Sequence, residues 1–329
     1  MIYKMMSDED LDEFTNYLSG KSLSTIRQYR QRVGHLYKHF NKPITDITID
    51  EFVNFAKGKG RPNNEALNPN TASQYINALN KYWFMKEKKP TDFINYRNKV
   101  LDGEIQKYTK KTNNELNKHL PSMDIVMKNE DNHKKNKNTK AYMMSYLCRT
   151  FYTRNLDLDV KIITSRSEIK DDSNYLLLLK RPNRVEYIRN KYKTVSKYGP
   201  KTFIIVDKDF VRVANEQHKK DDLYLFDNRP TEDSDKDPAI AWRNYESACC
   251  KTIKRNLGGL GEGLLLKIQI NNIKDKNELV AIEESRGTSV SYLLRSYNTD
   301  YPKSNQVENP LYEVSEPSTI ASSSSECED

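Results

Sequence analysis

The stretch Asn174-Tyr-Leu-Leu-Leu-Leu-Lys-Arg-Pro-Asn-Arg-Val-Glu-Tyr-Ile188 decides the fold class of this chain. It contains two short apolar runs, 174–179 and 184–188, which are rich in leucine, tyrosine and β-branched residues and have the pattern of β-strands. Two further strand patterns flank it, Val160-Lys-Ile-Ile163 and Thr202-Phe-Ile-Ile-Val206. The sequence therefore predicts a small β-sheet in the middle of the chain.

Helical patterns surround these strands on both sides. Start signals such as Thr48-Ile-Asp-Glu51, followed by apolar residues at helical spacing, predict a compact bundle of about four short helices within residues 7–100. A loosely patterned, Asn/Lys-rich helical stretch leads from there to a strongly apolar helix over 141–149. After the strands, helical patterns return at 208–218, 239–256, 264–273, 278–285 and 289–297. The fold class predicted is mainly α with a small β-sheet, an α+β protein.

The composition favours a polyanionic partner. The 329 residues include 54 basic and 46 acidic side chains, which gives a formal net charge of +8 and a pI of about 9.0. A positive balance of this kind attracts nucleic acid without dictating the fold. Lysine-rich proteins reach the same pI without binding nucleic acid, so a helical protein-interaction module is an alternative reading of the charge.

The cysteines and the apolar runs indicate the cellular compartment of the protein. Cys148, Cys249, Cys250 and Cys327 have no disulfide-like spacing, which fits a reducing compartment. The N-terminus lacks the apolar core of a signal peptide, and no apolar run approaches the roughly 20 residues that span a bilayer. We expect an intracellular protein, in the cytoplasm or nucleus of a host cell, that is neither secreted nor held in a membrane.

No metal or nucleotide cofactor is expected. His35 and His39 share a helix face, but no third ligand accompanies them. The Gly258-Gly-Leu-Gly-Glu-Gly263 stretch lacks the Gly-Lys-Ser/Thr of a phosphate-binding loop and follows no strand, so it is predicted to be a connection.

A candidate nucleophile lies near the end of the helical part. In Arg286-Gly-Thr-Ser-Val-Ser-Tyr-Leu-Leu-Arg-Ser-Tyr297, a helix-forming run begins after a Gly-Thr-Ser corner and ends at a tyrosine. Tyrosine is among the side chains that form covalent intermediates. The alternative is that Tyr297, one of 21 tyrosines, packs a helix.

Three segments of the N-terminal bundle resemble a known family in their order and spacing: Ser24-Thr-Ile-Arg-Gln-Tyr29, Pro43-Ile-Thr-Asp-Ile-Thr-Ile-Asp-Glu-Phe52 and Asn70-Thr-Ala-Ser-Gln-Tyr-Ile-Asn-Ala-Leu79. With the downstream helices and strands, they resemble a tyrosine recombinase (phage-integrase-like) of a divergent viral or mobile-element branch. The resemblance covers roughly residues 7–300. It implies a helical SAM-like core-binding domain over 1–100, a catalytic domain with a small antiparallel sheet over 101–301, and a disordered polar tail over 302–329.

The resemblance also implies a chemistry. In this family a tyrosine attacks a DNA phosphodiester, which leaves a 3'-phosphotyrosyl link and a free 5'-hydroxyl, with arginines binding the phosphate and a lysine donating the proton. Tyr297 is then the nucleophile and Arg154 the first arginine, preferred to Arg149. Lys193, in the basic stretch 191–206, is the proton donor, with Lys201 or Lys197 as alternatives.

Two family positions are substituted. The His-x-x-Arg box aligns with Gly263-Leu-Leu-Leu-Lys-Ile-Gln269, which puts Leu264 at the histidine and Lys267 at the arginine. Thr288 stands where the family usually has a second histidine or a tryptophan. Arg286 is a candidate to supply, from a different position, the guanidinium of the missing family arginine. In oxyanion-type sites, the loss of one preorganised hydrogen-bond donor lowers the reaction rate by about 10²–10³-fold.

Two functions follow from the resemblance. The first is a site-specific recombinase or integrase that cuts and rejoins double-stranded DNA, as a tetramer when two sites are synapsed. The second is a catalytically degenerate relative that keeps only DNA binding.

Overall fold

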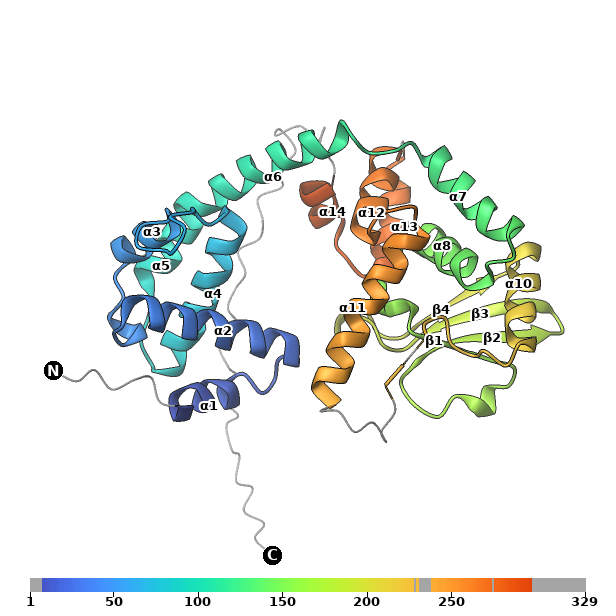
Figure 1. Cartoon of the computed structure of the whole chain (residues 1–329), viewed down its shortest axis with the longest axis horizontal. Coiled ribbons are helices and arrows are strands. Elements are labelled where there is room, and N and C mark those ends of the chain that lie inside the picture. Colours follow the sequence, from blue (N-terminus) through green and yellow to red (C-terminus); the bar gives the residue numbers. More distant parts are fainter. Residues whose placement is uncertain (1–7, 228, 231–237, 274, 298–329) are drawn as a thin grey trace, which may run out of the picture. The chain divides into compact units, whose positions relative to one another are not determined.

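The computed structural model describes residues 8–227, 229–230, 238–273 and 275–297 (Figure 1). The chain divides into two compact units, Met1–Leu120 and Pro121–Asp329. The polar tail proposed over 302–329 lies outside the described residues.

The first unit is helical throughout its described part. Three of its helices have a side-chain cap, because the side chains of Ser22, Thr48 and Asn68 accept the free N–H groups of the first turns. Its elements are α1 (Asp8–Tyr17), α2 (Leu23–Phe40), the 3-10 turn η1 (Ile44–Asp46), α3 (Ile49–Ala56), α4 (Pro69–Met85), α5 (Thr91–Tyr96), the π-helical turn η2 (Arg97–Leu101) and α6 (Asp102–Asn117).

The core of this unit reaches Leu101, one residue beyond the range 7–100 predicted for the bundle. Phe52, Phe55 and Leu79 are fully buried, as helical spacing predicts. Phe93 of α5 and Leu101 of η2 belong to the same core, and both α5 and α6 contact α4. The first unit therefore includes helices whose sequence pattern is weak.

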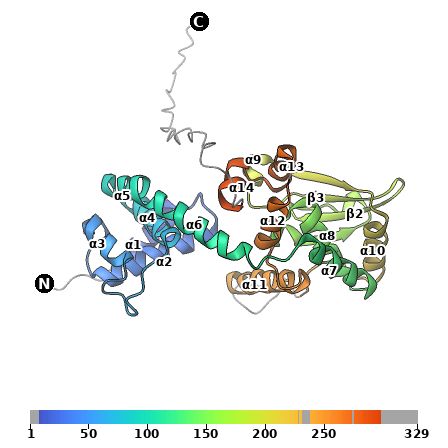
Figure 2. The ribbon, with the colours of Figure 1, turned by 90° about the horizontal axis from the view of Figure 1, so that it is seen from above.

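The second unit consists of helices around one sheet. Helix α8 (Thr139–Phe151) is its centre, since it contacts α7 (Met123–Lys135), α10 (Lys208–Lys219), α11 (Pro238–Asn256), α12 (Glu262–Asn271) and α13 (Lys276–Arg286). Figure 2 shows α7, α8 and α12 beside one another. Helix α10 contacts three of the strands. The remaining elements are η3 (Asn155–Leu158), η4 (Arg166–Glu168), α9 (Val195–Tyr198) and α14 (Val290–Tyr297).

The four predicted strands form one sheet in the order β1-β2-β3-β4. They are β1 (Val160–Ile163), β2 (Asn174–Lys180), β3 (Asn183–Arg189) and β4 (Lys201–Ile205). The fold class, mainly α with a small sheet, is confirmed.

The expectation of a purely antiparallel sheet is wrong for its first strand. β1 runs parallel to β2, with Val160 opposite Asn174, whereas the β2–β3 and β3–β4 pairs are antiparallel. The reason is the connection 164–173. It contains the turn η4 and carries the chain back to the starting end of the sheet, which a tight hairpin cannot do.

Candidate active site

Arg154 lies in the turn between helix α8 and the sheet. Tyr152 ends α8 in the left-handed conformation, with φ 51°, and Arg154 follows in extended conformation at the start of η3. Its backbone N–H donates to Asp157 Oδ2 at 3.1 Å. Its Nη2 donates to Thr288 Oγ1 at 2.7 Å, while its buried Nη1 has no hydrogen-bond partner. One face of this guanidinium thus retains an unused donor, which is rare for a buried group.

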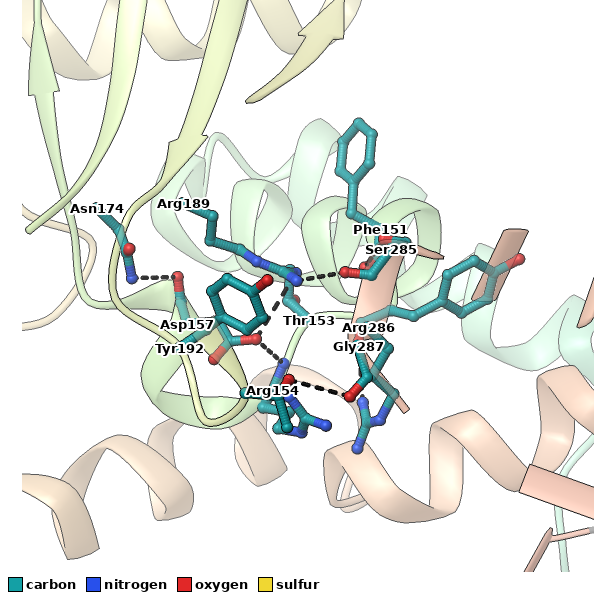
Figure 3. Close-up of polar contacts among 12 residues, drawn as sticks. Phe151, Thr153, Arg154, Asp157, Asn174, Arg189, Tyr192, Ser285, Arg286 and Gly287 are labelled. Carbon is teal, nitrogen blue, oxygen red and sulfur yellow. Dashed lines mark hydrogen bonds and ion pairs between the residues drawn. The ribbon is translucent and has the colours of Figure 1, made fainter. Parts of the chain in front are cut away.

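Arg286 comes to the same place from helix α13. Its side chain is buried, and its Nη1 donates to the Tyr152 carbonyl oxygen at 2.9 Å. Its Nη2 donates to Glu262 Oε2 at 2.8 Å. In Figure 3 the Arg154 and Arg286 side chains extend toward the same side of the turn. The structure therefore joins two arginines that are far apart in the sequence.

The corner after Arg286 requires glycine. Gly287 ends α13 with φ +67°, and its N–H donates to the Glu283 carbonyl at 2.7 Å. The Gly287 carbonyl accepts a hydrogen bond from Thr194 Oγ1 at 3.0 Å, and a Cβ at this position would come within 2.4 Å of the same Oγ1. This close approach places Thr288 against Arg154.

The electrostatics of the cluster favour an anion. Burial lowers the pKa of Arg154, and the nearby Arg286 lowers it further. Burial raises the pKa of Asp157, whereas the positive charge of Arg189 opposes that rise. Among the described residues of the cluster, the three guanidinium groups have Asp157 and Glu262 as acidic ion-pair partners. The planar fork of arginine suits the oxygens of a phosphate.

The structure separates the three candidate lysines of the 191–206 segment. Lys201, the first residue of β4, is half-buried beside the rings of Tyr192 and Tyr198. Burial lowers its pKa, as do the charges of Arg189 and Arg154. Lys193 and Lys197 have exposed side chains. Lys201 is therefore the lysine that the charge environment links to the arginine cluster.

The other predicted residues lie on the α12 and α14 segments. Burial lowers the pKa of Lys267, which is half-buried on α12 together with Leu264. Leu293 of α14 packs on Leu266 in a small core that joins α12, α13 and α14. Tyr297 is the last residue of α14, and its side chain lies outside the described part.

The alternative arginine, Arg149, has a different role in the structure. Its Nε and Nη2 donate to the two carboxylate oxygens of Glu130 at 2.9 and 2.8 Å, which joins α8 to α7. A bidentate pair of this kind uses the side of the guanidinium that a phosphate would need.

Sequence reasoning missed Arg189 and Glu262. Arg189 is the last residue of β3 and is 0% exposed, and Glu262 is the first residue of α12 and binds Arg286. Nothing in their local sequence distinguishes them from other charged residues at element ends. Their partners come from segments that are distant in the sequence.

The described residues contain neither a helix long and apolar enough to cross a membrane nor a group of three or more metal-binding side chains. His35 and His39 instead pack against Phe55 of the first unit.

Comparison with solved structures found a similar chain. No family model matches the chain, and no curated protein does. The crystal structure of XerA recombinase is similar with a TM-score of 0.30 and 14% identity, over 90% of this chain and 94% of that chain. At this TM-score the likeness does not establish a common fold.

Proposed function

We propose that this protein cuts and rejoins double-stranded DNA through a covalent tyrosyl intermediate. The observation that carries the proposal is the Arg154–Thr288 contact beside Arg286, immediately before the helix that ends at Tyr297. A buried cluster with excess positive charge and an unused guanidinium N–H suits a phosphodiester. The resemblance of the sequence to tyrosine recombinases supports the same chemistry.

The proposed reaction needs no reactant besides the protein and the DNA. The Tyr297 phenol oxygen attacks phosphorus, its proton leaves to solvent or a nearby base, and the bond from phosphorus to the 5'-oxygen breaks. The products are a 3'-phosphotyrosyl link and a 5'-hydroxyl, which attacks in the reverse direction when strands are rejoined. Arg154 and Arg286 would stabilise the charge that develops on the phosphate oxygens.

We assign the proton donor for the leaving oxygen to Lys201. Its burial and its arginine neighbours lower its pKa, which makes its proton easier to transfer. Lys193, with its exposed side chain, is the alternative. Lys267, which stands at a family arginine position, is proposed to add positive charge from α12.

The experiment uses a pool of duplexes that carry randomised sequence and a nick, so that the short 5'-hydroxyl fragment is lost after cleavage and the adduct accumulates. Wild-type protein should give a protein–DNA adduct that survives denaturation, and Tyr297→Phe should give none. Tyr292→Phe is the matched control, because Tyr292 is an exposed tyrosine of the same helix. Equal signals from wild type and Tyr297→Phe would contradict the proposal.

One observation favours a second function, a DNA-binding protein that does not cleave. Nη1 and Nη2 of Arg286 already donate to the Tyr152 carbonyl and to Glu262, and Thr288 stands where the family has an imidazole. Salt-sensitive DNA binding without any adduct would support this reading. A tetramer on synapsed DNA belongs only to the first proposal.

A further inference from the structure

Arg189 is a buried charge that the reaction proposed above does not use. It is the last residue of β3, and its side chain is among the largest that are completely buried. A buried arginine is costly unless its donors and charge are satisfied. The environment of this side chain therefore indicates what it does.

Its contacts reach two separate segments. Nη2 donates to the carbonyl oxygen of Ser285, and Nη1 lies 3.6 Å from Asp157 Oδ2 (Figure 3). The guanidinium also stacks over the rings of Tyr192 and Phe203, at 4.7 and 5.4 Å from the ring centres. Nε and Nη1 have no hydrogen-bond partner, so charge and stacking, more than hydrogen bonds, hold the group.

Each of these two segments holds one of the arginines proposed to bind the phosphate. Asp157 accepts the backbone N–H of Arg154 at 3.1 Å, so it fixes the turn from which Arg154 extends. Ser285 directly precedes Arg286, and its own Oγ donates to the Phe151 carbonyl at 2.6 Å. One guanidinium thus ties the turn of Arg154 to the end of the helix that carries Arg286.

The stacked ring extends the connection to the lysine. Tyr192 donates its hydroxyl to the Gly199 carbonyl at 2.6 Å, just before Lys201 begins β4. Arg189 and Lys201 are also directly opposite each other in the β3–β4 pairing.

We propose that Arg189 is a positioning residue that sets the separation of Arg154 and Arg286 and holds the Lys201 strand beside them. This inference rests on the proposed function, because one of its tests is the rate of adduct formation. Its physical basis is that reacting groups must be held by a rigid second layer of contacts, and a misplacement of about 1 Å costs about 10²-fold in rate.

The test compares Arg189→Met, Arg189→Lys and the double variant Arg189→Met/Asp157→Asn by the rate of adduct formation and by DNA affinity. The double variant removes both buried charges, so it avoids the unpaired carboxylate that would hinder folding. Asp157→Asn also keeps an oxygen acceptor for the Arg154 N–H. Arg184→Met is the control, because Arg184 lies on the same strand and binds Glu186 instead.

We expect the folded double variant to form adduct about 10²-fold more slowly with unchanged DNA affinity. Arg189→Lys should recover part of the rate, because an ammonium keeps the charge but loses the planar stacking. Arg184→Met should match wild type. A double variant that folds and reacts at the wild-type rate would overturn the inference.

The pH dependence of the rate of adduct formation tests positioning directly, because a general loss of rigidity would lower the rate without shifting its pH profile. The groups that act on Lys201 are Arg189 on β3, Arg154 in the turn and Glu284 on α13, next to the rings of Tyr192 and Tyr198. Loss of the positive charge at Arg189 favours the protonated lysine. The alkaline limb of the rate should therefore move to higher pH in Arg189→Met, which removes only the positive charge.

A measurement without catalysis separates this inference from the proposed function. Inorganic phosphate is titrated into wild type and the double variant, and the Nε–Hε resonances of Arg154 and Arg286 are followed by NMR. If wild type forms no adduct but phosphate shifts both resonances in wild type alone, the function fails and the role of Arg189 stands. If phosphate shifts them equally in both proteins, the positioning role is excluded.

Discussion

Gly287 shows how one residue fixes the corner before helix α14. Its left-handed backbone and its contact with Thr194 leave no room for a side chain, since a Cβ would lie 2.4 Å from Thr194 Oγ1. Gly287→Ala should destabilise the second unit by about 1–3 kcal/mol. Urea unfolding in a Trp83→Phe background, where Trp242 reports on the second unit, measures this change.

Gly263→Ala provides the matched control for that prediction. Gly263 lies in the first turn of α12, and no atom is within 4 Å of an added Cβ. The substitution should be neutral or should stabilise the unit by up to about 1 kcal/mol, because alanine favours the helix. If both substitutions cost the same, the close approach at Gly287 is not what restricts that position.

Arginine 149 and arginine 154 differ in a way that only long-range contacts reveal. Arg149 is the last residue of the predicted apolar helix and Arg154 follows five residues later, so a sequence pattern cannot separate them. Arg149 binds Glu130 of α7, whereas Arg154 contacts Thr288 from the other end of the unit. The preference for Arg154 therefore gains a physical reason in the partners of each side chain.

At the scale of elements, the capping box of α3, formed by Thr48 and Glu51, makes the stability of the first unit depend on pH. Hydrogen bonds from Lys42, then from the Thr48 backbone, lower the pKa of Glu51 to about 2. Because the folded pKa lies below the unfolded value of about 4.3, the stabilisation is present above that pH and is lost as the pH falls toward 2. Glu51 is 40% exposed, so solvent screening limits the gain to about 1 kcal/mol or less.

Glu51→Gln tests this dependence. At neutral pH the variant should be less stable than wild type, and the difference should shrink as the pH falls below about 4. Urea unfolding in a Trp242→Phe background, where Trp83 reports on the first unit, measures it at each pH. Glu87→Gln, an exposed glutamate beyond the end of α4, should show no comparable trend. A Glu51→Gln difference that is constant with pH would rule out the capping-box carboxylate as its cause.

At the scale of the whole molecule, the net charge of +8 predicts salt-sensitive DNA binding. Each phosphate neutralised by a lysine or arginine releases counterions, so a few contacts already weaken binding by about 10-fold or more between about 50 and 200 mM salt. Fluorescence anisotropy with a labelled duplex measures the slope. Absence of binding at about 50 mM salt would favour the protein-interaction module instead.

The sequence by itself determined the features that depend on neighbouring residues. Apolar spacing and caps located the helices, the runs 160–163, 174–179 and 184–188 located the first three strands, and the Gly-Thr-Ser corner located the helix that ends at Tyr297. These signals are local because helices and strands repeat over a few residues.

Only the tertiary structure decided how distant segments meet. It made β1 parallel to β2, separated Arg154 from Arg149, set Lys201 near the arginines and buried Arg189 against Asp157 and the Ser285 carbonyl. The physical reason is that a charged side chain takes its role from the groups around it. For Arg189 and Arg154 those groups come from parts of the chain that no periodicity connects.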